Sequence, residues 1–489
     1  MNSQPRDRIE PWVWRIAAIV ILGSVMSILD TTIVNVALTS LARELHSSVA
    51  QIQWVVTGYL LSLAAVIPVA GWAGRRFGPK RVYLVSLVLF TAGSALCGVA
   101  SSTTELVAFR VLQGVGGGMI LPIGQLMMAS AAGPQRMGRV MSVIAVPAML
   151  APIFGPAIGG LIIDNASWRW IFFVNVPIGA IAFIAALRGL KELERRPAGR
   201  LDVAGLAMIA TGMPAITYGL AEIGSTGGFS SVKVIVPIVL GVSLVVAFCV
   251  HALRAERPLL DLRLYSRPTF AAASITTFCL GAALFGAMVL MPLYYQQVRG
   301  ESVLDTGLLV GFSGIGAALV LPIAGRLSDR LGGGPVALVG VLITCTATVP
   351  LALIGAHTSI LYLSLVLVVR GVGVGCAFIP AMSAAYAALR PEQLSDATPQ
   401  MNVLQRLGGS LGVAVLAVVL QRSIIGAGHS AGLAGIAGAY GTAFWWAFAI
   451  AAAAIIPCIV LMRAERAIAR REDAAAAPAL EPEPEPVGV

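Results

Sequence analysis

Asp30 and Arg110 have the clearest capacity for chemistry in this sequence, because each is a charged residue inside a long apolar run. The run around Asp30 extends from about Trp14 to Leu38, which at about 1.5 Å per residue is long enough to cross a bilayer core of about 30 Å. A carboxylate at that depth costs about 2.5–3.5 kcal/mol unless it is paired, protonated or in contact with water. We therefore interpret Asp30 as functional, with a role in helix packing alone as the alternative.

Arg110 lies near the outer end of an apolar run that crosses in the opposite direction, so the two charges are expected at comparable depth. Arginine stays charged and favours an ionised carboxylate beside it, whereas burial favours the neutral acid. That balance suits a reversible proton carrier. A permanent structural ion pair is the alternative interpretation.

The composition indicates the setting of these charges. The 489 residues are 58% hydrophobic and 11% charged, with a mean hydropathy of +0.88, which is far too apolar for a soluble protein. The net charge of +10 comes from short basic clusters between apolar runs, a pattern typical of membrane topology rather than of nucleic-acid binding. The chain is predicted to be an all-α polytopic membrane protein.

The apolar runs predict fourteen transmembrane helices, and the excess of Lys and Arg in alternate loops places both termini in the cytoplasm. The predicted spans are residues 14–38, 53–73, 82–100, 105–128, 139–163, 170–188, 203–222, 232–253, 269–292, 304–325, 335–356, 359–382, 400–421 and 440–462.

An internal repeat divides the chain. The loop from Gly71 to Arg81 is matched by the loop from Gly325 to Gly332, and Arg110 and Arg370 each precede a glycine-rich run. We therefore expect an N-terminal six-helix bundle (1–200), two linker helices (201–266), a C-terminal six-helix bundle (267–463) and a disordered cytoplasmic tail (464–489).

Several functions find no support in the sequence. No lysine follows a glycine, as a phosphate-binding loop of the Walker type requires. The six cysteines lie in apolar runs without a CxxC pair, and no paired carboxylates or nucleophile motif stand out. We expect neither an enzyme nor a metal or cofactor site, and any active transport would draw on an ion gradient.

Two stretches could move or lock helices. The loop after the second span carries Arg75, Arg76, Lys80 and Arg81, which could hold a gate shut or could simply follow the positive-inside rule. The fifth span has glycines and prolines at Gly155, Pro156, Gly159 and Gly160, a pattern that allows close packing and bending. Ordinary packing is the alternative for that span.

These stretches resemble the major facilitator superfamily, and specifically its fourteen-span drug:proton antiporter family of the EmrB/QacA type. The segment from Leu29 to Leu38 is similar to that family's first-span signature, and Arg110-x-x-Gln113-Gly114 to its fourth-span motif. Gly155-Pro156-x-x-Gly159-Gly160 is similar to its antiporter motif. The segment from Trp168 to Gly179 is similarly characteristic, and the resemblance covers nearly the whole chain.

The resemblance implies that Asp30 is the protonation site, Arg110 its coupling partner, the fifth span the seal between the halves, and the Gly71–Arg81 loop the inner gate. One position departs from the family, because Arg75 stands where an acid is usual, whereas the second copy keeps Asp329. The first-half gate is then looser or latched by other acids. The expected gating positions are Gly71, Arg75, Gly78, Lys80, Arg81, Gln113, Gly114, Gly155, Pro156, Gly159, Gly160, Gly325, Asp329, Arg330, Arg370 and Arg406.

The predicted function is proton-coupled export of lipophilic drugs by alternating access, in a bacterial cytoplasmic membrane. Only three of the 33 basic residues are lysines, a bias typical of GC-rich bacterial genomes. A single deep acid favours neutral or monocationic substrates over dications. Import of a small nutrient is the alternative. The partners are a small lipophilic substrate, protons and the bilayer, with a monomer expected and an accessory protein left open. Candidate pocket residues are Met26, Asn35, Tyr59, Met149, Phe285 and Met288.

Overall fold

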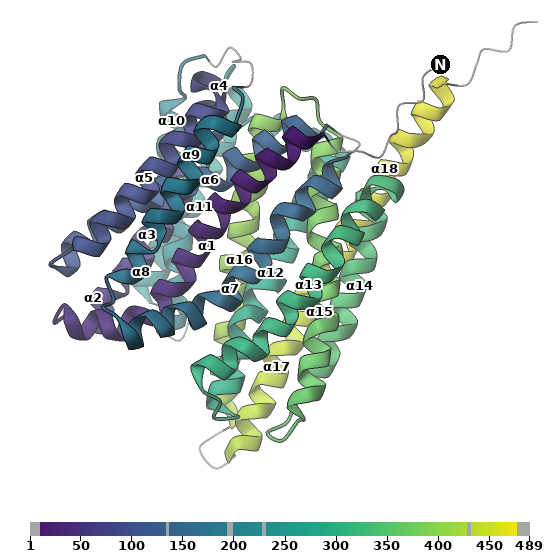
Figure 1. The fold of residues 1–489 in the computed structure, drawn as a ribbon. Helices are drawn as coiled ribbons and strands as arrows, with labels where there is room; N and C mark the ends of the chain where they lie inside the picture. The colour runs from purple at the N-terminus through teal and green to yellow at the C-terminus, as the bar shows by residue number, and fades with distance from the viewer. Residues whose placement is uncertain (1–9, 134–135, 193–198, 227–230, 428–431, 477–489) are drawn as a thin grey trace, which may run out of the picture.

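The computed structural model describes residues 10–133, 136–192, 199–226, 231–427 and 432–476 as long helices joined by short loops (Figure 1). Helices are the expected solution in a bilayer, because each satisfies its own backbone hydrogen bonds. Within those ranges twelve helices are long and apolar enough to cross a membrane, or thirteen if one pair bent by 57° is counted as a single span. The 29-residue helix α7 is not among them, so the count of fourteen stays a prediction.

The helices form two groups and a connecting pair. The first group contains α1 (Pro11–Glu44), α2 (Val49–Ile52), α3 (Trp54–Val66), α4 (Val69–Phe77), α5 (Pro79–Val99), α6 (Thr103–Ala132), α7 (Met137–Asn165), α8 (Trp170–Phe173) and α9 (Asn175–Gly189). The second contains α12 (Pro268–Gln297), α13 (Val303–Leu331), α14 (Gly333–Ala352), α15 (Ile360–Ala387), α16 (Leu394–Ala427), α17 (Gly432–Ala453) and α18 (Ile455–Ala476). We call these groups the first and the second half. Between them come α10 (Val203–Thr226), α11 (Val232–Arg254) and the short 3-10 helix η2 (Leu262–Ser266).

The repeated loops make the same turn in both halves. Gly78 ends α4 with a φ of 89°, and Gly332 ends α13 with a φ of 87°. Glycine adopts this left-handed conformation without the steric cost that other residues meet. A new helix, α5 or α14, begins directly after each glycine.

The two halves touch through a few helices. α7 packs against α1 of its own half and against α13 of the other, while α4 and α6 contact α16. In Figure 1 the ribbons lie side by side near α4 and diverge toward the end that holds α2 and the start of α17. We call the joined end, with Arg75, Gly138, Asp329 and Asp396, the closed end, and the other the open end.

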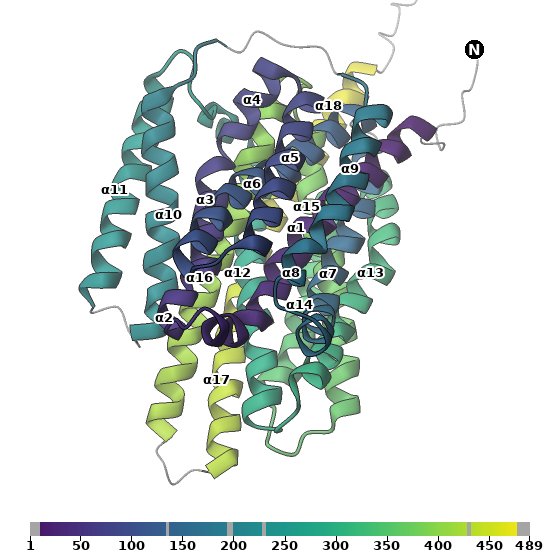
Figure 2. The same cartoon turned by 60° about the vertical axis from the view of Figure 1, so that its left-hand side comes forward.

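The connecting helix α10 lies along the junction of the halves. It contacts α3 on one side and α16 on the other, and α11 packs on its outer face (Figure 2). Tyr218 of α10 stacks on Trp54 of α3 with ring centroids 5.9 Å apart, and Leu220 packs with Val418 of α16. α10 is therefore more than a connection, because it contacts both halves.

Several helices differ from the predicted spans. The span predicted at 53–73 is broken into α3 and α4, the one at 170–188 into α8 and α9, and the one at 440–462 crosses the end of α17. The predicted disorder from residue 464 is wrong for 464–476, which continue α18. These residues are rich in alanine, arginine and glutamate, which favour helix. Glu465 also accepts hydrogen bonds from the N–H groups of Gly333 and Gly334 at 3.0 and 2.6 Å. Residues 477–489 lie outside the described ranges.

Candidate functional site

The structure brings Asp30 and Arg110 into direct contact inside the first half. An Arg110 guanidinium nitrogen donates to Oδ2 of Asp30 at 2.6 Å, and neither side chain is exposed (0% each). A buried ion pair is costly to desolvate, and it survives only when further hydrogen bonds satisfy its atoms. The depths estimated from the sequence were therefore correct for this pair.

Two amide side chains complete the shell around the carboxylate. Gln113 and Asn175 each donate to Oδ1 of Asp30 at 2.9 Å, and the Gln113 oxygen accepts from Arg110 at 2.9 Å. The Asn175 amide also donates to Ser94 at 3.1 Å, and the Ser94 hydroxyl continues to the carbonyl of Phe172 at 2.9 Å. Helices α1, α5, α6 and α9 thereby converge on one carboxylate.

Arg110 is fixed from the other side by α3. Its Nε donates to the carbonyl of Val55 at 3.1 Å, and its guanidinium lies 4.1 Å from the ring centroid of Tyr59. The Tyr59 hydroxyl is 3.1 Å from that of Ser27, so the ring is itself anchored. Only Nη2 of Arg110 lacks a partner among the described residues. The arginine is thus held for pairing with Asp30, with one donor unused.

Asn175, Ser94 and Ser27 were not predicted as members of the site. Asn175 was visible as part of a characteristic segment, and it is an amide in an apolar run, which is the same kind of signal that pointed to Asp30. Gln113 was expected in a gating motif and instead bonds both members of the ion pair. Tyr59 was expected in a substrate pocket, but it is fully buried against Arg110.

Arg75 forms a contact between the halves at the closed end. It donates to Oδ1 of Asp396 at 2.6 Å and to the Ser395 hydroxyl at 2.8 Å, both at the start of α16. The side chains of Arg75 and Asp396 are only 17% and 18% exposed. The unusual arginine at this position therefore has an acid partner in the other half. Of the two alternatives left open by the sequence, the structure favours a latch through other acids.

A second contact between the halves uses Asp329. Its carboxylate accepts from the backbone N–H groups of Gly138 and Arg139 at 2.9 and 3.3 Å, at the start of α7. Anions are favoured at this position because the first N–H groups of a helix have no partner within it. Gly325 packs against the backbone of the same residues. The loop copies thus contact the opposite half at both positions.

Other gating positions lie around these contacts. A Cβ added to Gly71 would collide with the carbonyl oxygen of Ser395, so α4 approaches α16 closely. Lys80 donates to the carbonyls of Leu187 and Leu190 at 2.8 and 2.6 Å, at the C-terminal end of α9. Arg81 is 4.0 Å from Glu192, and Arg330 is exposed. Lys80, Arg81 and Arg330 therefore do not connect the two halves through these contacts.

Two glycines in the middle of α7, Gly155 and Gly159, face its own half. Gly155 lies against Thr32, and Gly159 against Ile33, both on α1. A Cβ on Gly160 would meet nothing within 4 Å, and the side chain of Pro156 is outside the description. The fifth span, which the resemblance implies to be the seal, packs against α13 of the second half, but the nearest neighbours of Gly155 and Gly159 are on α1. These two glycines bring α7 close to the helix that carries Asp30.

The predicted pocket residues whose side chains are described lie in different environments. Met26 and Tyr59 are fully buried in the core of the first half, whereas Asn35 is exposed near the end of α1. Phe285 is 37% exposed beside Gly409, and Met288 is half-buried. The side chain of Met149 lies outside the description. Periodicity could not separate these environments, because apolar side chains occupy both the core and the surface of a membrane protein.

Among the residues that the structure describes, the second half has no counterpart of the ion pair. Arg370 is 4% exposed, donates to the carbonyl of Ala283 at 3.2 Å, and has an Nε without a partner among the described residues. Gly114, in the glycine-rich run after Arg110, and Gly371, directly after Arg370, each pack against the backbone of a neighbouring helix. Arg406 on α16 is half-buried. The two copies of the repeat therefore differ in charge: Arg110 of the first half is paired with an acid, whereas Arg370 of the second half donates to a backbone carbonyl.

The arrangement is that of a polytopic helical membrane transporter, with two bundles joined at one end and one buried carboxylate in the first. The profile of the Major Facilitator Superfamily matches residues 20–413. The chain belongs to this superfamily.

Two similar proteins within it have names that refer to multidrug resistance or export. A multidrug resistance protein B homolog of Mycobacterium tuberculosis (strain H37Rv) is 37% identical over 418 residues, covering 85% of this chain and 77% of the relative. The multidrug export protein EmrB of Haemophilus influenzae is 30% identical over 400 residues, covering 81% and 78%. The human organic anion transporter MFSD10 shares the fold, with a TM-score of 0.66 and 16% identity over 92% of this chain and 100% of that one.

Proposed function

We propose that this chain is a proton-coupled antiporter that exports lipophilic drugs or antibiotics by alternating access. It would work as a monomer in a bacterial cytoplasmic membrane, with both termini and the closed end toward the cytoplasm. The proton gradient would drive it, without a cofactor. The observation that carries the proposal is the fully buried Asp30, whose charge is balanced by Arg110. The multidrug names of the relatives support the substrate class.

Protonation of Asp30 would change the balance of the buried site. A neutral acid no longer offsets the charge of Arg110, and breaking a buried pair by removing one charge costs about 3–5 kcal/mol. That free energy is large enough to favour a conformation in which Asp30 or Arg110 meets water or another partner. One proton crossing about 100 mV supplies about 2.3 kcal/mol, enough for roughly a fiftyfold gradient of a neutral substrate.

The packing offers a route from the carboxylate to the junction of the halves. Thr32 and Ile33 follow Asp30 on α1 and lie against Gly155 and Gly159 of α7. α7 in turn packs along α13 of the second half. A shift of α1 on protonation would therefore displace α7 and change its contact with α13, because closely packed helices move together.

The test is transport of a lipophilic dye in proteoliposomes under an imposed pH gradient, comparing the parent with Asp30→Asn. The asparagine keeps the size of the side chain but cannot carry the proton. We expect driven transport to be lost while dye binding is retained. Asp305→Asn is the matched control, because Asp305 is an exposed acid at the start of α13 and should tolerate the change.

Full driven transport by Asp30→Asn would refute the assigned role and leave Asp30 as a packing residue. The direction of flux decides the remaining alternative. Dye that moves against the proton flow supports antiport, whereas dye that moves with the protons would overturn the exporter proposal in favour of proton-coupled import.

A further inference from the structure

We propose that α12 and α16 form a binding site for an amphiphilic organic anion. The apolar body of the ligand would occupy a cavity between the two helices, and its acidic group would pair with Arg406. The assignment rests on the proposed function, because it names the substrate class of an exporter. It also replaces the neutral or monocationic substrates expected from the sequence.

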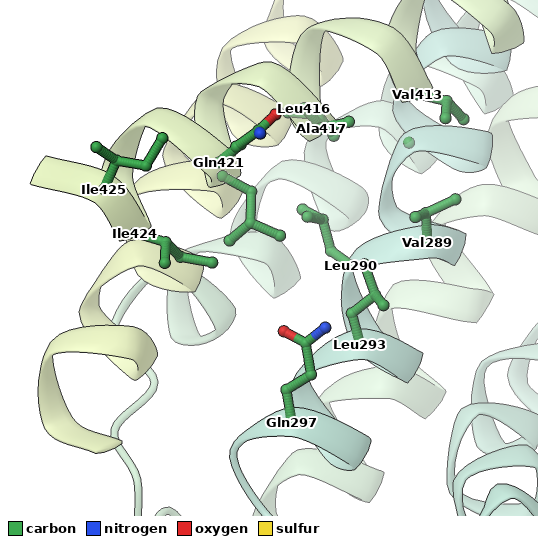
Figure 3. A pocket seen from close by; sticks show the side chains of 12 residues that line it. Val289, Leu290, Leu293, Gln297, Val413, Leu416, Ala417, Gln421, Ile424 and Ile425 are labelled. Carbon is green, nitrogen blue, oxygen red and sulfur yellow. The ribbon is translucent and has the colours of Figure 1, made fainter. Parts of the chain in front are cut away.

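The cavity lies between the open-end portions of α12 and α16 and has a volume of about 360 Å³ (Figure 3). Its walls are mostly aliphatic, with Val289 and Leu293 on α12 and Val413 and Leu420 on α16. Cavities of about 300 Å³ or more with apolar walls and few polar groups are typical of small-molecule sites. The polar groups are the amides of Gln297 and Gln421.

Arg406 belongs to the same stripe of α16 as the cavity wall. From Arg406 the residues Val413, Ala417, Leu420 and Ile424 follow at steps of seven, four, three and four, which is the spacing of one helix face. Seven residues advance about 10 Å along a helix. Arg406 therefore lies about two turns from Val413, toward the closed end and on the same side.

This face of α16 turns toward the first half. Asn402, one turn before Arg406, donates to Gln125 of α6 at 2.7 Å. The guanidinium of Arg406 is within electrostatic range of Tyr59 on α3. A ligand in the cavity would thus have Arg406 on the side of the closed end. The Asn402–Gln125 contact between the halves lies one turn further in the same direction.

No acid within the described ranges pairs with the charge at this position. Arg406 forms no ion pair with the residues that the structure describes, and it is half-buried. The acidic residues between 268 and 427 all fall in loops or near helix ends, namely Glu301, Asp305, Asp329, Glu392 and Asp396. A cation that leaves water without a partner is costly, so an anionic ligand gains from supplying the missing charge.

The negative charge of Asp30 is not accessible to a ligand in the cavity, because its side chain is fully buried. Asp30 is the carboxylate in the middle of the first half, and it is fully buried behind Arg110 with hydrogen bonds to both oxygens. Arg370 adds a second positive charge inside the second half. A cationic ligand would therefore meet like charge and no accessible acid, which disfavours binding.

The test uses three naphthalene probes of nearly equal size: the anionic naphthalene-2-sulfonate, the neutral naphthalene-2-sulfonamide and the cationic 2-naphthyltrimethylammonium. Dissociation constants are measured on the full chain in nanodiscs at neutral pH. We expect the parent to bind the sulfonate about tenfold more tightly than the sulfonamide, as a charge-assisted hydrogen bond allows. The ammonium probe should bind most weakly.

Variants separate the charge from the cavity. Arg406→Gln should remove the preference for the sulfonate but keep binding of the sulfonamide, which also shows that the variant is folded. Arg406→Lys should keep part of the preference. Arg422→Gln, at an exposed arginine on the same helix, is the matched control and should behave like the parent. Ala417→Phe, which fills the cavity, should weaken all three probes.

Two results would overturn the assignment: a parent that binds the ammonium probe as tightly as the sulfonate, or an Arg406→Gln variant that keeps the sulfonate preference. The proton-driven dye assay on the same preparations keeps the two proposals apart. Driven transport without anion preference refutes only this inference. Anion preference without driven transport supports the site and refutes the exporter mechanism.

Discussion

The contact of Arg75 with α16 should hold the closed end together, and Arg75→Ala should open it. The change removes a hydrogen bond to Ser395 and a charge-assisted one to Asp396, at 2.8 and 2.6 Å, between side chains of Arg75 and Asp396 that are less than one-fifth exposed. A hydrogen bond to a charged group contributes about 1.5–3 kcal/mol. A loss of about 2 kcal/mol corresponds to a roughly thirtyfold shift toward states in which the halves separate at this end.

Distances between spin labels can measure that shift. In a background without the six cysteines, labels at the exposed positions Phe77 and Arg390 report the separation of α4 from the loop before α16. We expect Arg75→Ala to increase the long-distance population. Arg76→Ala, at the exposed neighbouring residue, should leave the distribution unchanged.

A charge exchange provides the sharper test. Arg75→Asp alone places two acids face to face and should open the end further, whereas combining it with Asp396→Arg should restore part of the short-distance population. If Arg75→Ala leaves the distribution as in the parent, the contact does not latch the halves, and the other contacts between them, among them the α7–α13 packing, must hold them together.

Three further predictions follow from single residues. Gly71→Ala should loosen the closed end, because the new Cβ would collide with backbone, while Gly160→Ala has open space and should leave the label distances unchanged. Asn175→Leu should lower the free energy of unfolding by about 1.5–3 kcal/mol, because Asp30 loses a hydrogen bond, and a thermal denaturation assay would detect it. Partial burial by itself raises the pKa of Asp202, but hydrogen bonds from Gly205, Leu259 and His251 together hold it below its ordinary value. A lowered pKa stabilises the fold above the unfolded-state value of about 3.9 and ceases to do so as the pH falls further. Below about pH 4 the thermal midpoint of Asp202→Asn should therefore fall less steeply than that of the parent.

The buried ion pair was largely predictable from sequence, because a charged residue in an apolar run is rare and costs free energy to bury. That argument identified Asp30 and Arg110, and it applied equally to Asn175, whose amide lies in the same kind of run. Their comparable depth followed from the opposite directions of the two spans, and it made a direct contact possible. Depth along a helix is a property of the sequence, because each residue adds a fixed rise.

The partners of the closed end were not predictable in the same way. Arg75 was recognised as a departure from the family pattern, but its acid partner, Asp396, is 321 residues away in the chain. No periodicity connects such positions. Likewise, nothing in a single sequence showed that Gly155 and Gly159 face α1, because small residues permit close packing without naming the neighbour.

The sequence by itself determined that this chain spans a membrane, that its two halves are related by repetition, and that one carboxylate lies deep inside the first half. These features depend on local hydrophobicity and on counting residues along a helix. Only the tertiary structure decided which charges are neutralised. Arg110 pairs with Asp30, whereas Arg406 pairs with no acid in the part of the chain that the structure describes. The neutralisation of a buried charge depends on helices that meet in space and are distant in sequence.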